Sequence, residues 1–172
     1  MLYFYVYFGI IICGEFMKKI ITFGTIAIIL DQLIKIFINQ NMHLNESIKV
    51  IDGFFSITYV RNFGAAFSMF NGNRFFLIMI SIAATIFIYY IFIHNKKIDN
   101  INAAIYGFLF GGIIGNLIDR IVNGYVIDYL DFKIFNYDFP IFNLADICIV
   151  ISIILILITT IRRNSNGENN CR

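Results

Sequence analysis

The chain has 172 residues, of which 59% are hydrophobic and only 14% are charged, with 20 phenylalanines, 10 tyrosines and one proline. This composition is far too apolar for the surface of a soluble globular protein, and it places the chain in a membrane. The formal net charge of +2 is small and the basic residues lie in short flanks, which excludes the broad basic surface that nucleic-acid binding requires.

The chain starts with an apolar run over residues 1–16, upstream of a second methionine, Met17, that is followed at once by Lys18 and Lys19. A signal peptide has its basic residues before its apolar stretch, so this order favours an ordinary membrane-protein beginning at Met17. A fifth span is an alternative, although the run is short. We favour an over-extended start over a genuine amphipathic leader, and expect the membrane-embedded domain over residues 17–163.

Four segments downstream of Lys19 are long and apolar enough to span a bilayer, which takes about 20 residues of helix. They lie at about residues 20–38, 75–93, 103–122 and 143–161. Basic pairs flank them at Lys18-Lys19, Lys96-Lys97 and Arg162-Arg163. Because basic flanks stay in the cytoplasm, we expect cytoplasmic termini, with the connections 39–74 and 123–142 outside.

Three stretches of the chain carry further structural signals. Residues 53–60 are rich in aromatic and β-branched types, which predicts a small extracytoplasmic strand or sheet within residues 53–70. The third predicted helix carries Gly107, Gly111 and Gly115 at steps of four, so a neighbouring helix can approach that face closely. The polar tail, residues 164–172, has no core to join, and we expect it to be disordered.

Polar residues also lie inside the predicted spans, where a charge costs at least about 2.5 kcal/mol on insertion scales. Asp31 and Lys35 are four residues apart and share a helix face, where they can neutralise each other as a structural ion pair. Asn116, Asp119 and Arg120 share a face near the end of the third helix. Taken alone, they would do no more than cap and anchor that helix.

Asn143 and Asp146 lie three residues apart at the start of the fourth helix, where Asn143 can be the N-cap and Asp146 falls in the first turn. Because the first and third helices run outward and the fourth runs inward, all these polar groups lie near the outer membrane surface. Asp128, in the connection before the fourth helix, can fold onto the same place. It would supply a second carboxylate beside Asp146.

Two carboxylates at short range cannot both stay ionised, so the pair holds a single proton. Such a pair can split water across an amide, because one carboxylate takes a proton from the water while the other donates to the carbonyl oxygen and later to the leaving nitrogen. No serine or cysteine beside a histidine base competes with this chemistry, since His43 and His94 lie in separate polar connections.

No metal, other cofactor or disulfide frame is expected. Neither histidine has a carboxylate or cysteine at ligand spacing. Cys13, Cys148 and Cys171 are far apart and odd in number, so we interpret them as packing or tail residues.

From Met17 onward the chain resembles the lipoprotein signal peptidase (signal peptidase II) family, because five motifs occur in the family's order. They are Asp31-Gln32-Leu33-Ile34-Lys35, Arg61-Asn62-Phe63-Gly64-Ala65-Ala66-Phe67, Gly112-Ile113-Ile114-Gly115-Asn116-Leu117-Ile118-Asp119-Arg120, Val126-Ile127-Asp128-Tyr129 and Phe142-Asn143-Leu144-Ala145-Asp146. Any one alone is weak, whereas five in order are specific. Tyr129 departs from the phenylalanine common in the family, and residues 1–16 have no family counterpart.

The resemblance implies a mainly α integral membrane fold, a bundle of four transmembrane helices with a small extracytoplasmic β appendage. It implies that Asp128 and Asp146 are the catalytic pair. The residues implied to bind substrate or support the site are Asp31, Lys35, Asn62, Gly112, Asn116, Asp119, Arg120, Asn143 and Ala145.

The implied activity is that of an aspartic endopeptidase, which removes the signal peptide from diacylglyceryl-modified prolipoproteins by cleaving just before the lipidated cysteine. Its partners would be prolipoproteins bearing a lipobox, and membrane lipid. The resemblance further implies a monomer, inhibited by globomycin-type cyclic peptides, in the bacterial cytoplasmic (inner) membrane.

A small transporter or proton-coupled channel is the main alternative, because intramembrane Asp, Lys and Arg also mark ion pathways. Transporters spread polar groups through the bilayer midplane, often with broken helices or repeated halves. The predicted second span, residues 75–93, has no charged residue. A purely structural membrane subunit leaves the paired outer-face aspartates unexplained.

Overall fold

The computed structural model describes residues 2–64, 72–93, 99–135 and 137–165. Within them, four helices are long and apolar enough to cross a membrane. Their bounds are α1 (Leu2–Asn41), α2 (Arg74–Ile88) with its π-helical continuation η2 (Tyr89–Ile93), α3 (Asn100–Val122) and α4 (Leu144–Ser165). The predicted mainly α fold with four spans is confirmed.

The apolar run at residues 2–16 continues α1 and forms no separate element. As a result α1 has 40 residues, which at 1.5 Å per residue corresponds to about 60 Å, twice the thickness of a hydrocarbon core. The first two residues of the predicted disordered tail, 164 and 165, instead end α4, while residues 166–172 and the Lys96-Lys97 flank lie outside the described residues.

The connections 39–74 and 123–142 together form an antiparallel sheet, with the strand order β1 (Ser47–Ile51), β2 (Phe55–Asn62), β3 (Val126–Ile134) and β4 (Tyr137–Asp138) among the described residues. The expected strand in residues 53–70 is therefore present as β2, and residues 65–70 lie outside the described part. The expectation that Asp128 lies in a loop is wrong. Residues 126–134 pair with β2, with Asp128 opposite Val60, because the alternating apolar residues of this connection find a partner strand distant in sequence.

Helix α3 packs against α1 across the predicted face of small residues. A Cβ atom added at Gly107 would lie 2.8 Å from the carbonyl oxygen of Ile20, and one added at Gly111 would lie 2.7 Å from that of Gly24. Such distances are far below van der Waals contact, so only glycine permits this approach of the two backbones.

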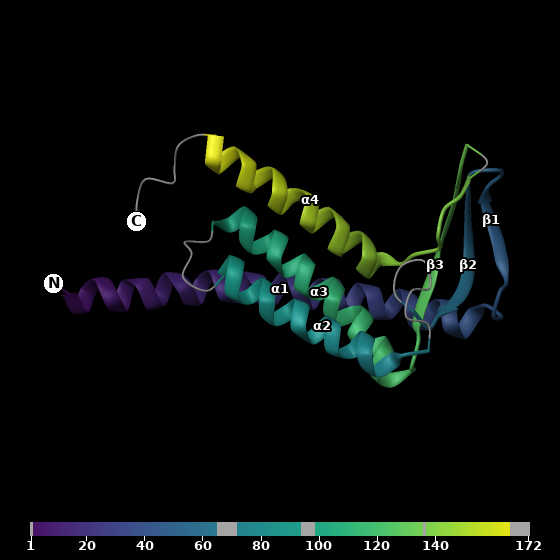
Figure 1. Cartoon of the computed structure of the whole chain (residues 1–172), viewed down its shortest axis with the longest axis horizontal. Coiled ribbons are helices and arrows are strands. Elements are labelled where there is room, and N and C mark those ends of the chain that lie inside the picture. The colour runs from purple at the N-terminus through teal and green to yellow at the C-terminus, as the bar shows by residue number, and fades with distance from the viewer. Residues whose placement is uncertain (1, 65–71, 94–98, 136, 166–172) are drawn as a thin grey trace.

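The sheet lies across the ends of the helices that are opposite the two chain termini, as Figure 1 shows. A buried cluster joins them: Ile38 of α1 and Met42, just after its end, pack against Tyr59 of β2 and against Ile127 and Tyr129 of β3. The start of β3 is thereby held over the ends of the bundle.

We expect Gly111→Ala to lower the free energy of unfolding by about 1–3 kcal/mol, because the new methyl group would overlap backbone atoms of α1. Gly14→Ala is the matched control, since a Cβ at this α1 position meets nothing within 4 Å and alanine favours a helix. Thermal unfolding in detergent would measure both. Equal stability of the two variants would contradict the close packing of α1 on α3.

Candidate active site

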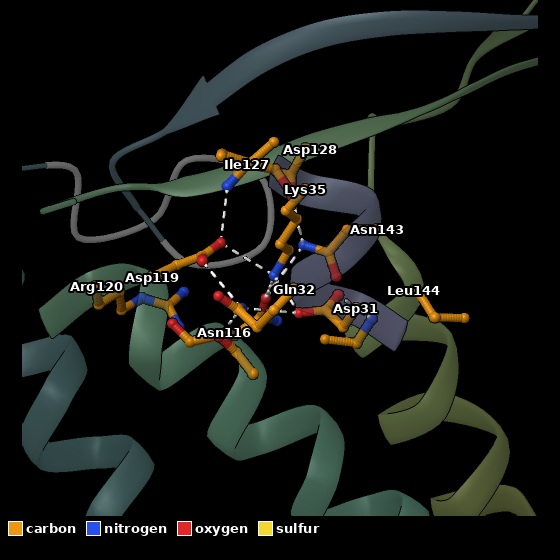
Figure 2. Close-up of polar contacts among 12 residues, drawn as sticks. Asp31, Gln32, Lys35, Asn116, Asp119, Arg120, Ile127, Asp128, Asn143 and Leu144 are labelled. Atoms are coloured by element: carbon orange, nitrogen blue, oxygen red, sulfur yellow. Dashed lines mark hydrogen bonds and ion pairs between the residues drawn. The ribbon is translucent and has the colours of Figure 1, made fainter. Parts of the chain in front are cut away.

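A buried lysine lies between two aspartates at the end of the bundle next to the sheet (Figure 2). The Nζ atom of Lys35 lies 2.8 Å from Oδ2 of Asp31 and 3.0 Å from Oδ2 of Asp119, and all three side chains are at most 2% exposed. The expected pair of Asp31 and Lys35 is present, and Asp119 is a second partner that spacing along one helix does not reveal. The cluster joins α1 to α3.

Gln32 belongs to the same cluster, although the sequence analysis gave it no role. Its Nε2 atom donates to Asp119 Oδ1 at 3.1 Å, to the Gly115 carbonyl oxygen at 3.2 Å and to Asp31 Oδ2 at 3.3 Å. The sequence did contain a signal for this role of Gln32, because it places a polar amide beside Asp31 within an apolar span.

The two aspartates of the cluster also hold the beginnings of two further elements. The backbone N–H of Ala145, in the first turn of α4, donates to Asp31 Oδ1 at 3.1 Å. The backbone N–H of Ile127, in β3, donates to Asp119 Oδ2 at 3.1 Å. Each of these residues is the immediate neighbour of a candidate catalytic aspartate, so the cluster positions the backbone on which Asp146 and Asp128 stand.

Asn116 links Lys35 to Asp146, one of the two candidate catalytic carboxylates. Lys35 Nζ donates to Asn116 Oδ1 at 2.9 Å, and Asn116 Nδ2 donates to Asp146 Oδ1 at 2.8 Å. Because an ammonium group can only donate, the amide oxygen of Asn116 must face Lys35 and its NH2 group must face Asp146.

Asn143 links the two candidate carboxylates. Its side chain accepts from the N–H of Asp146 at 3.0 Å, while Asp146 Oδ2 accepts from the N–H of Asn143 at 3.2 Å. This reciprocal pattern confirms Asn143 as the N-cap of α4 and resembles a capping box. The Nδ2 atom of Asn143 donates to Asp128 Oδ1 at 2.7 Å. Although we expected Asn143 to line the site, it is fully buried behind the two carboxylates.

Asn62 holds the other oxygen of Asp128. Asn62 Nδ2 donates to Asp128 Oδ2 at 2.9 Å, and its own oxygen accepts from the backbone N–H of Gly64 at 2.9 Å. Asp128 thus accepts one amide donor on each oxygen and is 3% exposed.

Asp128 and Asp146 border the same cavity, of about 780 Å³. Burial, together with the nearby charge of Asp146, raises the pKa of Asp128 to about 7, although the amides of Asn62 and Asn143 favour its ionised form. Between the ordinary pKa near 4 and this value, the folded protein retains a proton that the unfolded chain has lost. This carboxyl therefore favours folding least above pH 7, and it can donate a proton below that pH.

Arg120 reaches the cavity from α3. It donates to the carbonyl oxygen of Gly64 at 3.2 Å and more distantly to that of Asn116, and its buried Nε atom has no hydrogen-bond partner among the described residues. Because Arg120 borders the cavity, its guanidinium group can donate to a carbonyl oxygen of a ligand there.

Gly112 and Ala145 set the distance between α3 and α4 and do not border the cavity. A Cβ atom at Gly112 would lie 2.5 Å from the carbonyl oxygen of Ala145, whose own side chain is 1% exposed. Tyr129, the departure from the family pattern, accepts the N–H of Leu144 on its hydroxyl at 3.2 Å. A phenylalanine at this position would leave that helix-terminal donor without this acceptor.

Apart from Arg61, the remaining cavity wall is apolar, and the sequence analysis did not anticipate these residues. Most come from the segment before α4 and from α4 itself, and they include Phe139, Pro140, Ile141, Phe142, Ile147, Val150 and Ile151. Among the described residues, no group of three or more His, Cys, Asp and Glu side chains is arranged to hold a metal ion.

Known proteins resemble this chain over most of its length. Residues 23–162 match the family described as Signal peptidase (SPase) II. A lipoprotein signal peptidase of Staphylococcus aureus is 38% identical over 154 residues, covering 90% of this chain and 94% of that protein.

Two solved structures are also similar to this chain in fold and sequence. One, described as a bacterial membrane enzyme at 2.3 Å resolution, has a TM-score of 0.81 and 36% identity, and the match covers 90% of this chain and 94% of the other. Another with the same description, at 1.9 Å resolution, has a TM-score of 0.74 and 38% identity, covering 83% and 92%.

We expect Lys35→Met to cost about 3–5 kcal/mol in the free energy of unfolding, because it leaves two buried carboxylates without their cation. Asp31→Asn should cost less, since Lys35 keeps Asp119 as a partner. Lys133→Met is the control, because Lys133 and Asp138 are both exposed and such pairs contribute at most about 1 kcal/mol. Thermal unfolding in detergent tests this order, and an Asp31→Asn effect as large as that of Lys35→Met would refute the shared-cation arrangement.

Proposed function

Because the chain belongs to the signal peptidase II family, we propose that Asp128 and Asp146 are the catalytic pair with which it cleaves lipoprotein precursors. The protein is a membrane-embedded peptidase that removes signal peptides from lipoproteins. One observation carries the assignment of the pair. Two carboxylates from different elements, β3 and α4, border one cavity, and each accepts a directed amide donor from a buried asparagine network.

The mechanism follows from the protonation of the pair. Below pH 7 Asp128 holds a proton, and we assign the role of the base to Asp146. Asp146 takes a proton from water as the hydroxide oxygen adds to the carbonyl carbon, and Asp128 gives its proton to the carbonyl oxygen. Asp146 then passes its proton to the leaving nitrogen, the carbon–nitrogen bond breaks, and Asp128 recovers a proton from the collapsing diol.

The substrate we propose is a prolipoprotein whose lipobox cysteine carries diacylglycerol, with cleavage just before that cysteine. The apolar wall around Phe139, Phe142 and Val150 lies next to the carboxylates, so it can accept apolar residues or acyl chains while the peptide bond meets the pair. Arg120 also borders the cavity, so its guanidinium group can donate to a substrate carbonyl. We also propose that the enzyme acts as a monomer and that globomycin-type cyclic peptides inhibit it by occupying this cavity.

We propose that both termini lie in the cytoplasm and that the site lies near the outer face of the bacterial inner membrane. The basic flanks Lys18-Lys19 and Arg162-Arg163 support this orientation. In a cysteine-free background, His43→Cys should react with an impermeant thiol reagent in intact cells and Asn95→Cys should not. The opposite labelling pattern would show that the orientation in the membrane is the reverse of the one proposed.

We expect Asp128→Asn and Asp146→Asn each to lower kcat by about 10²–10⁴-fold or more, because asparagine keeps the size of the side chain but cannot transfer the proton. Asp131→Asn is the matched control: it lies on the same strand, accepts from Thr58 and does not border the cavity. Processing of a diacylglyceryl-modified precursor by purified variants, with thermal unfolding alongside, gives the measurement. Near-normal cleavage by either folded variant of the pair would exclude the mechanism.

We also expect kcat/KM to fall as the pH rises through about 7, because Asp128 loses the proton it must donate. The value of kcat/KM falls and does not rise with pH because the active form of Asp128 is the protonated one, which is present below its pKa. Unfolding temperatures at each pH separate this effect from instability. A rate that rises steadily from pH 6 to 9 would show that Asp128 is not the acid.

A further inference from the structure

The hairpin ends of the sheet carry large apolar side chains that the protein leaves uncovered. Beyond the end of β3, Phe135 is 100% exposed, and Ile134 and Tyr137 beside it are 42% and 61% exposed. In the neighbouring hairpin, Ile51 and Phe54 are 52% and 46% exposed. These five residues, called here the hairpin-end surface, do not border the cavity.

The two hairpin ends lie side by side. Phe55 pairs with Phe132, and the backbone N–H of Lys133 donates to the carbonyl oxygen of Phe54 at 2.9 Å. The five side chains therefore belong to one end of one sheet.

The backbone at Phe135 is itself unusual. Its φ angle is 48°, in the left-handed region that bulky side chains rarely adopt and that glycine or asparagine occupies more easily. A turn in water would gain from either of those residues, both in backbone strain and in solvation. Phenylalanine at this place indicates surroundings in which an aromatic ring is better solvated than it is in water.

The location of the hairpin-end surface indicates that lipid surrounds the ring of Phe135. Figure 1 shows the strands running across the helix axes, with the hairpin ends on the side of the molecule where α4 lies. The α4 helix exposes Ile151, Ile154 and Leu157, as expected of a helix face in contact with lipid. The hairpin ends therefore lie on the same side of the molecule as an apolar helix face suited to lipid.

The nearby charges are paired. Lys133 lies 3.3 Å from Asp138, and Lys49 lies 3.0 Å from Asp52. Pairing lowers the cost of bringing these groups near a medium of low dielectric constant. Aromatic residues such as Phe135 and Tyr137 suit the boundary between headgroups and acyl chains, where tyrosine in particular is enriched.

We infer that the hairpin-end surface is inserted into the interfacial layer of the membrane leaflet next to the site. Strand β3 carries Asp128 near its start and ends beside Phe135. At the start of β3 the N–H of Ile127 donates to Asp119, so lipid contact at Phe135 would hold the strand at both of its ends. The depth of Asp128 in the bilayer would then be set by the lipid as well as by the bundle.

The chain has no tryptophan, so one introduced tryptophan is the only indole fluorophore and reports its own surroundings. The test uses Phe135→Trp in the full chain, reconstituted at high lipid excess in phosphatidylcholine vesicles with acyl chains brominated at shallow or deep carbons. Ile154→Trp on α4 is the lipid-facing control, and His43→Trp, in the exposed connection after α1, is the control for water. Precursor cleavage by each variant verifies the fold, and Tyr137→Trp replaces Phe135→Trp if the latter is inactive.

The expected result is blue-shifted emission from Phe135→Trp that shallow bromines quench more strongly than deep ones, with the reverse preference for Ile154→Trp. Emission like that of His43→Trp, without quenching, would place the hairpin ends in water and overturn the inference. Blue-shifted emission that no brominated lipid quenches would show that protein, such as a second copy of the chain, covers the surface, which would overturn it equally.

Discussion

The buried ammonium group of Lys35 is the interaction on which the site depends. In surroundings of low dielectric constant its attraction to Asp31 and Asp119 is strong, and any one of the three charges left alone would be costly. Because the two aspartates also accept the backbone N–H groups of Ala145 and Ile127, one cation connects α1, α3, α4 and β3. The two carboxylates proposed to be catalytic stand on the last two of these elements.

Lys35 and the N-cap of α4 determine how the two asparagines point. Lys35 can only donate, so Asn116 turns its NH2 group toward Asp146. Asn143 must accept the N–H of Asp146 as a helix cap, which turns its NH2 group toward Asp128. Each carboxylate therefore receives an NH2 donor whose direction is fixed by the other hydrogen bonds of the same asparagine. Such preorganisation lets a reaction proceed without rearrangement of the surrounding dipoles.

Close helix packing is a precondition for this arrangement. A Cβ atom at Gly115 would lie 2.7 Å from Oδ2 of Asp31, so the face of small residues on α3 makes room for the charge cluster as well as for α1. Burial then has two effects. It strengthens the attraction within the cluster, and it raises the pKa of Asp128 so that a proton is available near neutral pH.

The sequence by itself determined the four spans, the pairing of Asp31 with Lys35 and the cap at Asn143, because hydropathy, helical spacing and capping are properties of short segments. Its five ordered motifs also indicated the family and the candidate pair. Only the tertiary structure decided that Asp128 lies in a strand paired with β2, that Asp119 shares the lysine, and that Phe135 is uncovered. These features depend on contacts between residues far apart in the chain, whose partners and register are set by packing of whole elements and leave no local periodicity to read.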